Sequence, residues 1–160
     1  MCLHSSTLLR ALALLTITVG GCAIGTPFPR WQATTTAEHD QQVVLVITRI
    51  VVNPGKRREF DRQTSLVINS MPSHPGLLGY SARRELFGDQ GWTISVWTDD
   101  EARRNFVRSA VHRQAIQQSE SAIVTVELKR LTLSQSALPN NWASALALFD
   151  APANKRTYIH

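Results

Sequence analysis

The feature that most constrains the fold is the run VVLVITRIVV at residues 43–52. It is rich in β-branched residues, and apolar side chains stand at both odd and even positions. Successive side chains of a strand point to opposite faces, so we expect both faces of this strand to be covered. Asn53-Pro54-Gly55 ends the run, because these residues favour a turn and proline cannot continue a central strand. The run therefore predicts a central strand.

The segments after this strand alternate between helical and strand patterns. A Thr-Asp-Asp-Glu capping box at residues 98–101 opens the second helix, with Thr98 as the cap, and this helix is expected to break near residues 108–110. Apolar spacing predicts helices at 56–71 and 98–118, and strands at 77–87, 92–98 and 122–133. The order βαββαβ predicts an α+β fold, a ferredoxin-like antiparallel sheet with two helices on one face.

Two helices can cover only one face of such a sheet. The first strand carries apolar side chains toward the other face as well, among them Val43, Leu45 and Ile47. Packing that face against a second copy of the chain would remove it from water. We therefore predict a homodimer.

The N-terminal segment has the pattern of a bacterial signal peptide. Arg10 precedes a short apolar run, which is far below the roughly 20 residues that span a membrane. Val19-Gly20-Gly21-Cys22 resembles the lipobox of lipoproteins, which implies cleavage before Cys22 and acylation of its thiol. A plain secretory signal or an uncleaved anchor is the alternative. Cys2 would leave with the signal, so no disulfide is expected in the mature chain.

These patterns divide the chain into four parts. We expect a lipoprotein signal peptide at 1–21, a flexible tether at 22–41, the ferredoxin-like domain at 42–135, and a short helix with a loose tail at 136–160. The lipobox resemblance implies a lipid anchor in the bacterial cell envelope. Ala23 rather than aspartate follows the cysteine, which implies the outer membrane facing the periplasm if the host is Gram-negative.

Composition excludes several other classes of protein. With 43% hydrophobic and 18% charged residues, the chain is typical of one globular domain. The net charge of +5 is spread along the chain without exposed aromatic residues between the basic ones, so no nucleic-acid partner is predicted. The histidines are scattered and no cysteine pair accompanies them, so no metal site is predicted.

Four motifs resemble the antibiotic biosynthesis monooxygenase family of small dimeric α+β barrels. They are VNPGKRREF after the first strand, HPGLLGY opening the second, SVWTDDEA leaving the third, and SAVH in the second helix. The resemblance extends over residues 43–133. It implies a pocket between sheet and helices. In some members it also implies oxidation of electron-rich aromatic molecules by dioxygen, with no bound cofactor.

The haem-degrading branch of this family is not expected. Its pattern would need asparagine, tryptophan and histidine at the positions where this chain has Thr48, Phe106 and Ile116. All three residue types differ.

Six residues are candidates for the pocket, each with a structural alternative. Trp97 could equally fill a corner of the core, donating its indole N–H to a backbone carbonyl. His112 is expected beside the buried stripe of its helix, so it could be a capping or surface residue. Arg49 is the one charge in the central strand, and it could meet a carboxylate, an anionic ligand or the dimer partner. Catalytic candidates are His112, Trp97 and Arg49, and further pocket candidates are Tyr80, Phe106 and Arg84.

Two functions are consistent with these residues. The first is a cofactor-independent oxidoreductase, resembling the monooxygenases, that acts on a small aromatic or quinol-like molecule. The second is a non-catalytic envelope lipoprotein that holds a small apolar or aromatic ligand. The enzyme hypothesis rests on the resemblance alone, because no acid–base pair in the sequence demands it.

Overall fold

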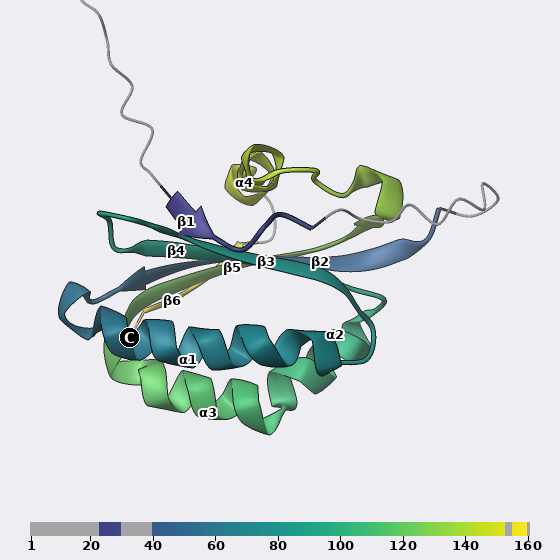
Figure 1. The fold of residues 1–160 in the computed structure, drawn as a ribbon. Helices are drawn as coiled ribbons and strands as arrows, with labels where there is room; N and C mark the ends of the chain where they lie inside the picture. The colour runs from purple at the N-terminus through teal and green to yellow at the C-terminus, as the bar shows by residue number, and fades with distance from the viewer. Residues whose placement is uncertain (1–22, 30–39, 153–154, 160) are drawn as a thin grey trace, which may run out of the picture.

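The computed structural model describes residues 23–29, 40–152 and 155–159, and in it one sheet separates two layers of helix (Figure 1). The helices of this part of the chain are α1 (Arg57–Ser70), α2 (Asp100–Arg108), α3 (Ala110–Ser119) and α4 (Trp142–Asp150). Its strands are β1 (Ala23–Gly25), β2 (Gln42–Val52), β3 (Leu77–Glu85), β4 (Gln90–Trp97), β5 (Ile123–Ser134) and β6 (Lys155–Ile159).

The strands that the structure describes form one antiparallel sheet in the order β1-β3-β4-β2-β5-β6. Strand β2 lies near the middle, as its two-sided apolar pattern predicts. Thr48 at its centre is opposite Thr93 of β4 and Leu128 of β5. The inner four strands with α1, α2 and α3 confirm the predicted α+β, ferredoxin-like fold.

Helices α1, α2 and α3 cover one face of the sheet (Figure 1). The break between α2 and α3 falls at Ser109, whose extended backbone (φ −60°, ψ 151°) ends one helix and starts the next. The cap of α2 is Asp99 rather than the predicted Thr98. The Asp99 carboxylate accepts a hydrogen bond from the Ala102 amide at 2.8 Å, while Thr98 donates its hydroxyl to Asp99.

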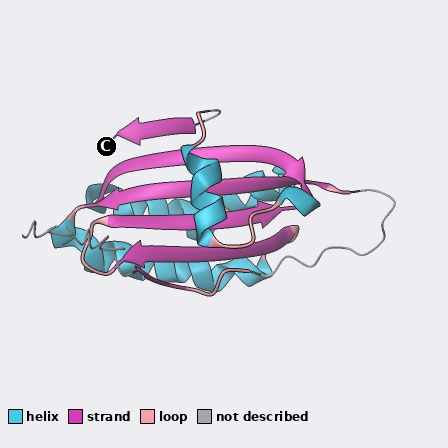
Figure 2. Ribbon diagram, turned by 90° about the horizontal axis from the view of Figure 1, so that it is seen from above, coloured by secondary structure: helices cyan, strands magenta, loops and turns pink. Residues whose placement is uncertain are grey.

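Helix α4 crosses the strands on the opposite face of the sheet (Figures 1 and 2). Phe149 of α4 is 1% exposed and packs in the same core cluster as Val43, Leu45 and Ile47. Phe28 packs edge-on against Trp142, with ring centroids 5.6 Å apart. The chain therefore covers with its own helix the strip of apolar side chains that we expected a second copy to cover.

Two basic residues of the sheet hold α4 in place. Lys129 is only 2% exposed and donates hydrogen bonds from Nζ to the carbonyls of Phe149 and Ala151, at the C-terminal end of the helix. A positive charge is favourable there, because the free carbonyls of a helix end carry partial negative charge. The guanidinium of Arg83 lies over the rings of Trp92 and Trp142, at 4.8 and 5.3 Å from their centroids.

The structure also differs from the expected tether and tail. Residues 23–25 form β1 and pair with β3, and Phe28 contacts the α4 layer, so these residues are part of the folded domain. Residues 155–159 form β6, which extends the sheet beyond β5 (Figure 2). Cys22 and the predicted signal peptide lie outside the described residues. In the ranges that the structure describes, no helix is both long and apolar enough to cross a membrane.

Candidate functional site

A cavity of about 1020 Å³ lies between the sheet and the helices α1, α2 and α3. Its floor is made by the helix-facing side chains at the centre of the sheet, among them Thr48 of β2 with Thr93 and Ser95 of β4. These side chains are short. The opposite face of the same strands carries Ile47 and Val96, both fully buried under α4. The large side chains fill one layer, and the short polar ones leave room in the other.

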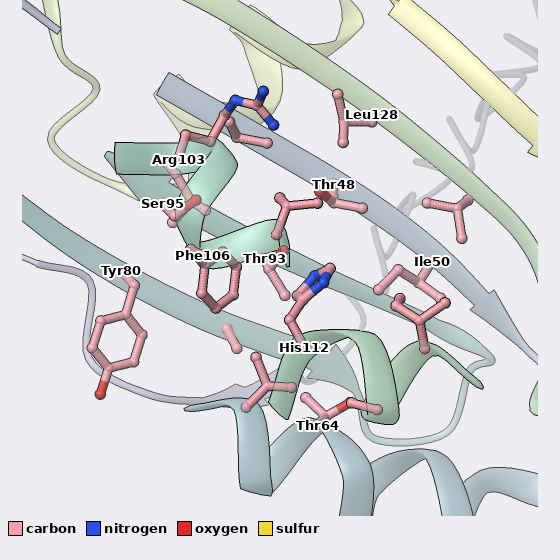
Figure 3. A pocket seen from close by; sticks show the side chains of 18 of the residues that line it. Thr48, Ile50, Thr64, Tyr80, Thr93, Ser95, Arg103, Phe106, His112 and Leu128 are labelled. Carbon is pink, nitrogen blue, oxygen red and sulfur yellow. The ribbon is translucent and has the colours of Figure 1, made fainter. Parts of the chain in front are cut away.

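Aromatic side chains form one wall of the cavity. Trp97 and Phe106 stack with ring centroids 5.1 Å apart, and Tyr80 packs against the same cluster. Trp97 is fully buried and still lines the cavity, so the core and pocket alternatives for this residue both hold. Its indole N–H donates to the hydroxyl of Ser95 at 3.0 Å rather than to a backbone carbonyl. The Tyr80 hydroxyl points away from His112 (Figure 3).

His112 projects from the first turn of α3 into the cavity, and its ring points toward β2 (Figure 3). Its imidazole meets Phe106 edge-on, with centroids 4.7 Å apart. On one continuous helix these two residues would lie on different sides. The break at Ser109 changes the direction of the chain and brings them together, and the Ser109 hydroxyl then accepts a hydrogen bond from the His112 amide.

Burial lowers the pKa of His112 below its usual value of 6.5. A hydrogen bond to the main chain of Val107 acts in the opposite direction, and the charge of His74 lowers the pKa further. The imidazole is therefore neutral at pH 7, with a nitrogen able to accept a proton.

One end of the cavity is positively charged. It is lined by Arg103 of α2 and Arg130 of β5, which share the carboxylate of Asp100 and which we call the arginine end. Arg156 of β6 also lines the cavity, opposite Leu128 and therefore level with Thr48. Arg103 donates from Nε to Asp100 at 2.6 Å, and Arg130 lies 3.2 Å from the same carboxylate oxygen. The hydrogen bond from Arg103 is the main reason why the pKa of Asp100 is below 3.8, so this carboxylate is ionised at neutral pH.

The structure brings four of the six candidates together and separates two. Trp97, His112, Tyr80 and Phe106 line the cavity, whereas Arg49 and Arg84 do not. Arg49 lies on the α4 face, where its Nε donates to Glu127 at 2.5 Å and its guanidinium lies 5.6 Å from the centroid of Phe149. Arg84 lies 3.6 Å from Asp61 of α1. Both arginines have carboxylate partners away from the cavity.

Sequence reasoning missed the polar floor and the arginine end. Thr93 and Ser95 alternate with large apolar residues in β4, and that alternation is the signal that could have identified a face with free space. Thr48, Phe106 and Ile116, the positions compared with the haem-degrading branch, all line the cavity. Among the residues that the structure describes, no three His, Cys, Asp or Glu side chains are grouped to hold a metal ion.

Residues 43–118 match the model of the family described as antibiotic biosynthesis monooxygenase. This match covers β2, α1, the hairpin of β3 and β4, α2 and α3, apart from the end residues Gln42 and Ser119. No curated protein is similar enough to the chain to count as a relative.

Three solved structures illustrate the similarity of fold. The protein PA3566 from Pseudomonas aeruginosa is 18% identical with a TM-score of 0.55, over 59% of this chain and 97% of that one. A Caulobacter crescentus protein described as a candidate antibiotic biosynthesis monooxygenase is 16% identical with a TM-score of 0.53, over 57% and 90%. Rv0793 from Mycobacterium tuberculosis is 17% identical with a TM-score of 0.53, over 63% and 98%. At these identities the comparison establishes the fold.

Proposed function

Because residues 43–118 match the antibiotic biosynthesis monooxygenase family, we propose that the protein oxidises an electron-rich aromatic molecule with dioxygen in the cavity beneath its helices. The observation that carries this proposal is the position of His112. It is a neutral base at the edge of an aromatic wall, and it faces a floor of short polar side chains.

The cavity suits a flat aromatic substrate. A volume of about 1020 Å³ is at the upper end of the range for small-molecule pockets, which is enough for a molecule of two or three rings. The stacked Trp97 and Phe106 offer aromatic surface for such rings. The hydroxyls of Thr48, Thr93 and Ser95 can hydrogen-bond to ring oxygens on the other side.

In the proposed reaction, His112 accepts the proton of a phenolic hydroxyl. The resulting anion is a stronger reductant than the neutral phenol, and it transfers an electron directly to dioxygen. For a hydroquinone, one oxygen atom enters the ring and the other leaves as water, while the ring ends as a hydroxyquinone. The substrate supplies all four electrons, so the balance requires no further reductant. His112 acts as a general base, for which its lowered pKa is suitable at neutral pH.

Oxygen uptake on a panel of hydroquinones tests this function. With 1,4-dihydroxynaphthalene we expect protein-dependent uptake of one dioxygen per substrate, and a product that contains one atom of labelled oxygen. 1,4-Dimethoxynaphthalene is the matched control, because it has no proton for His112 to accept. If oxygen uptake were no faster than without protein, while 1,4-dihydroxynaphthalene still quenched the tryptophan fluorescence, the result would favour the non-catalytic ligand carrier.

The location of the protein is a second part of the proposal: a lipid anchor at Cys22 that holds the domain at a bacterial membrane. The lipobox-like pattern supports it, and Ala23, the next residue, begins β1. An acylated Cys22 would therefore place the edge of the sheet close to the lipid surface. Mass spectrometry of the chain recovered from bacterial envelopes is expected to show an acylated Cys22 as the N-terminus. An intact Met1, or a start without lipid, would contradict the anchor.

A further inference from the structure

We infer that the substrate of this cavity is an aromatic acid, whose anionic group is held at the arginine end while its phenolic hydroxyl meets His112. The inference rests on the proposed function for the role of His112. The charge of the cavity is an independent observation.

Positive charge reaches the cavity from three separate elements. Arg103 is on α2, Arg130 on β5 and Arg156 on β6, and all three line the cavity. Arginines one turn apart on a helix surface often pair with an acidic neighbour without further meaning. That explanation fits Arg104, but it does not explain why strands β5 and β6 direct two further arginines toward the same space.

One carboxylate forms ion pairs with several arginines near this end. Asp100 lies 2.6 Å from Arg103, 2.5 Å from Arg104 and 3.2 Å from Arg130, so its single negative charge is shared among three guanidinium groups. The Arg103 side chain is only 17% exposed, so water screens its charge less than that of a surface residue. The local excess of positive charge favours an anion, and guanidinium groups bind carboxylates in a matched two-point geometry.

The sheet register gives the separation along the strand between Arg130 and the level of Thr48. Arg130 is opposite Val46, and Leu128 is opposite Thr48, one step further along the helix-facing side. Two residues of a strand span about 7 Å, and Figure 3 shows Arg103 and His112 extending toward Thr48 from opposite sides. A two-ring acid with its hydroxyl away from the arginine end matches this spacing.

Binding of two hydroxynaphthalenes to the full chain tests the inference. 6-Hydroxy-2-naphthoate carries its carboxylate and its hydroxyl at opposite ends of the two rings, and 6-hydroxy-2-naphthamide is its neutral counterpart of the same shape. Neither is a hydroquinone, so calorimetry measures their binding without oxidation by dioxygen. We expect the acid to bind at least about tenfold more tightly than the amide, the effect of one charge-assisted hydrogen bond. Added salt should weaken the binding of the acid and leave the affinity for the amide unchanged.

The variant R130Q/R156Q is expected to remove most of this preference and leave the affinity for the amide as it was. Both side chains are exposed, so the substitutions spare the core. R108Q is the matched control, since Arg108 is an exposed arginine of α2 that does not line the cavity. Equal affinities for acid and amide, a preference that survives in R130Q/R156Q, or no binding of either compound would overturn the inference. Oxygen uptake without a preference for the acid would support the proposed function and contradict the inference. A preference for the acid without oxygen uptake would support the anion site and contradict the proposed oxidation.

Discussion

Replacement of His112 by alanine is expected to lower kcat/KM for hydroquinone oxidation by about 10²–10⁴-fold, the usual contribution of a positioned general base. Without the imidazole, the phenolic proton has to leave to water, and the reducing anion forms less often. The measurement is the initial rate of oxygen uptake on 1,4-dihydroxynaphthalene. H112Q is the companion variant, because it keeps a polar side chain of similar length and cannot act as a base at neutral pH.

The pH dependence of the rate distinguishes a base from a residue that only shapes the cavity. Burial lowers the pKa of His112, so the neutral form persists below pH 6.5 and the rate should fall only at more acidic pH. In H112Q this fall should be absent. The free energy of unfolding should also fall with acidification. Below pH 6.5 the unfolded chain binds a proton at His112 that the folded chain does not, so acidification destabilises the fold.

R113A is the matched control for both measurements, because Arg113 is the exposed neighbour of His112 on the same helix. It should retain the rate and the pH profile of the unmodified chain. Thermal unfolding of each variant separates loss of the base from loss of the fold. If folded H112A oxidised the substrate within threefold of the unmodified rate, His112 would have no part in proton transfer.

Replacement of Phe149 by alanine is expected to lower the free energy of unfolding by about 3–5 kcal/mol, the usual cost of removing a buried phenylalanine ring. Phe149 is 1% exposed and, together with Ala145, joins α4 to the core cluster above β2 and β4. Denaturant unfolding followed by circular dichroism gives the value. L66A is the control, since Leu66 of α1 is 52% exposed and its replacement should cost less than about 0.5 kcal/mol.

The same variant tests whether α4 is the permanent cover of this face. Loosening α4 uncovers Val43, Leu45 and Ile47, so F149A is expected to associate in sedimentation experiments at concentrations where L66A does not. A loss of stability below 1 kcal/mol would mean that α4 contributes little to the core. The homodimer stays a prediction, and the position of α4 removes the uncovered face from which we argued for it.

The order of helices and strands could be predicted from the sequence, but the sequence did not show which face of β2 meets the helices α1, α2 and α3. Alternation in β2 shows that Thr48 shares a side with Val46 and Ile50, while Arg49 shares the other side with Ile47. Both sides are largely apolar, so alternation alone does not say which side meets the helices and which meets α4. Arg49 therefore looked like a pocket residue, although it pairs with Glu127 on the far side of the sheet.

The parts that could not be predicted depend on contacts between distant segments. Helical spacing placed His112 beside the buried stripe, because a wheel assumes one straight helix, whereas the break at Ser109 turns the residue inward. Nothing in NNWASALALF specifies which surface α4 should cover. The cover depends on Lys129, twenty residues earlier, which meets the carbonyl end of the helix.

The position of β6 brings residues from outside the family match into the lining of the cavity. This five-residue strand lies outside the stretch that matches the family model, yet Arg156 and Tyr158 reach the same chamber as His112. A change in this short C-terminal segment would therefore alter the lining of the cavity without altering the stretch that carries His112. Relatives that share the stretch corresponding to residues 43–118 but differ in this C-terminal segment would then be expected to differ in the ligand they select rather than in the reaction they carry out.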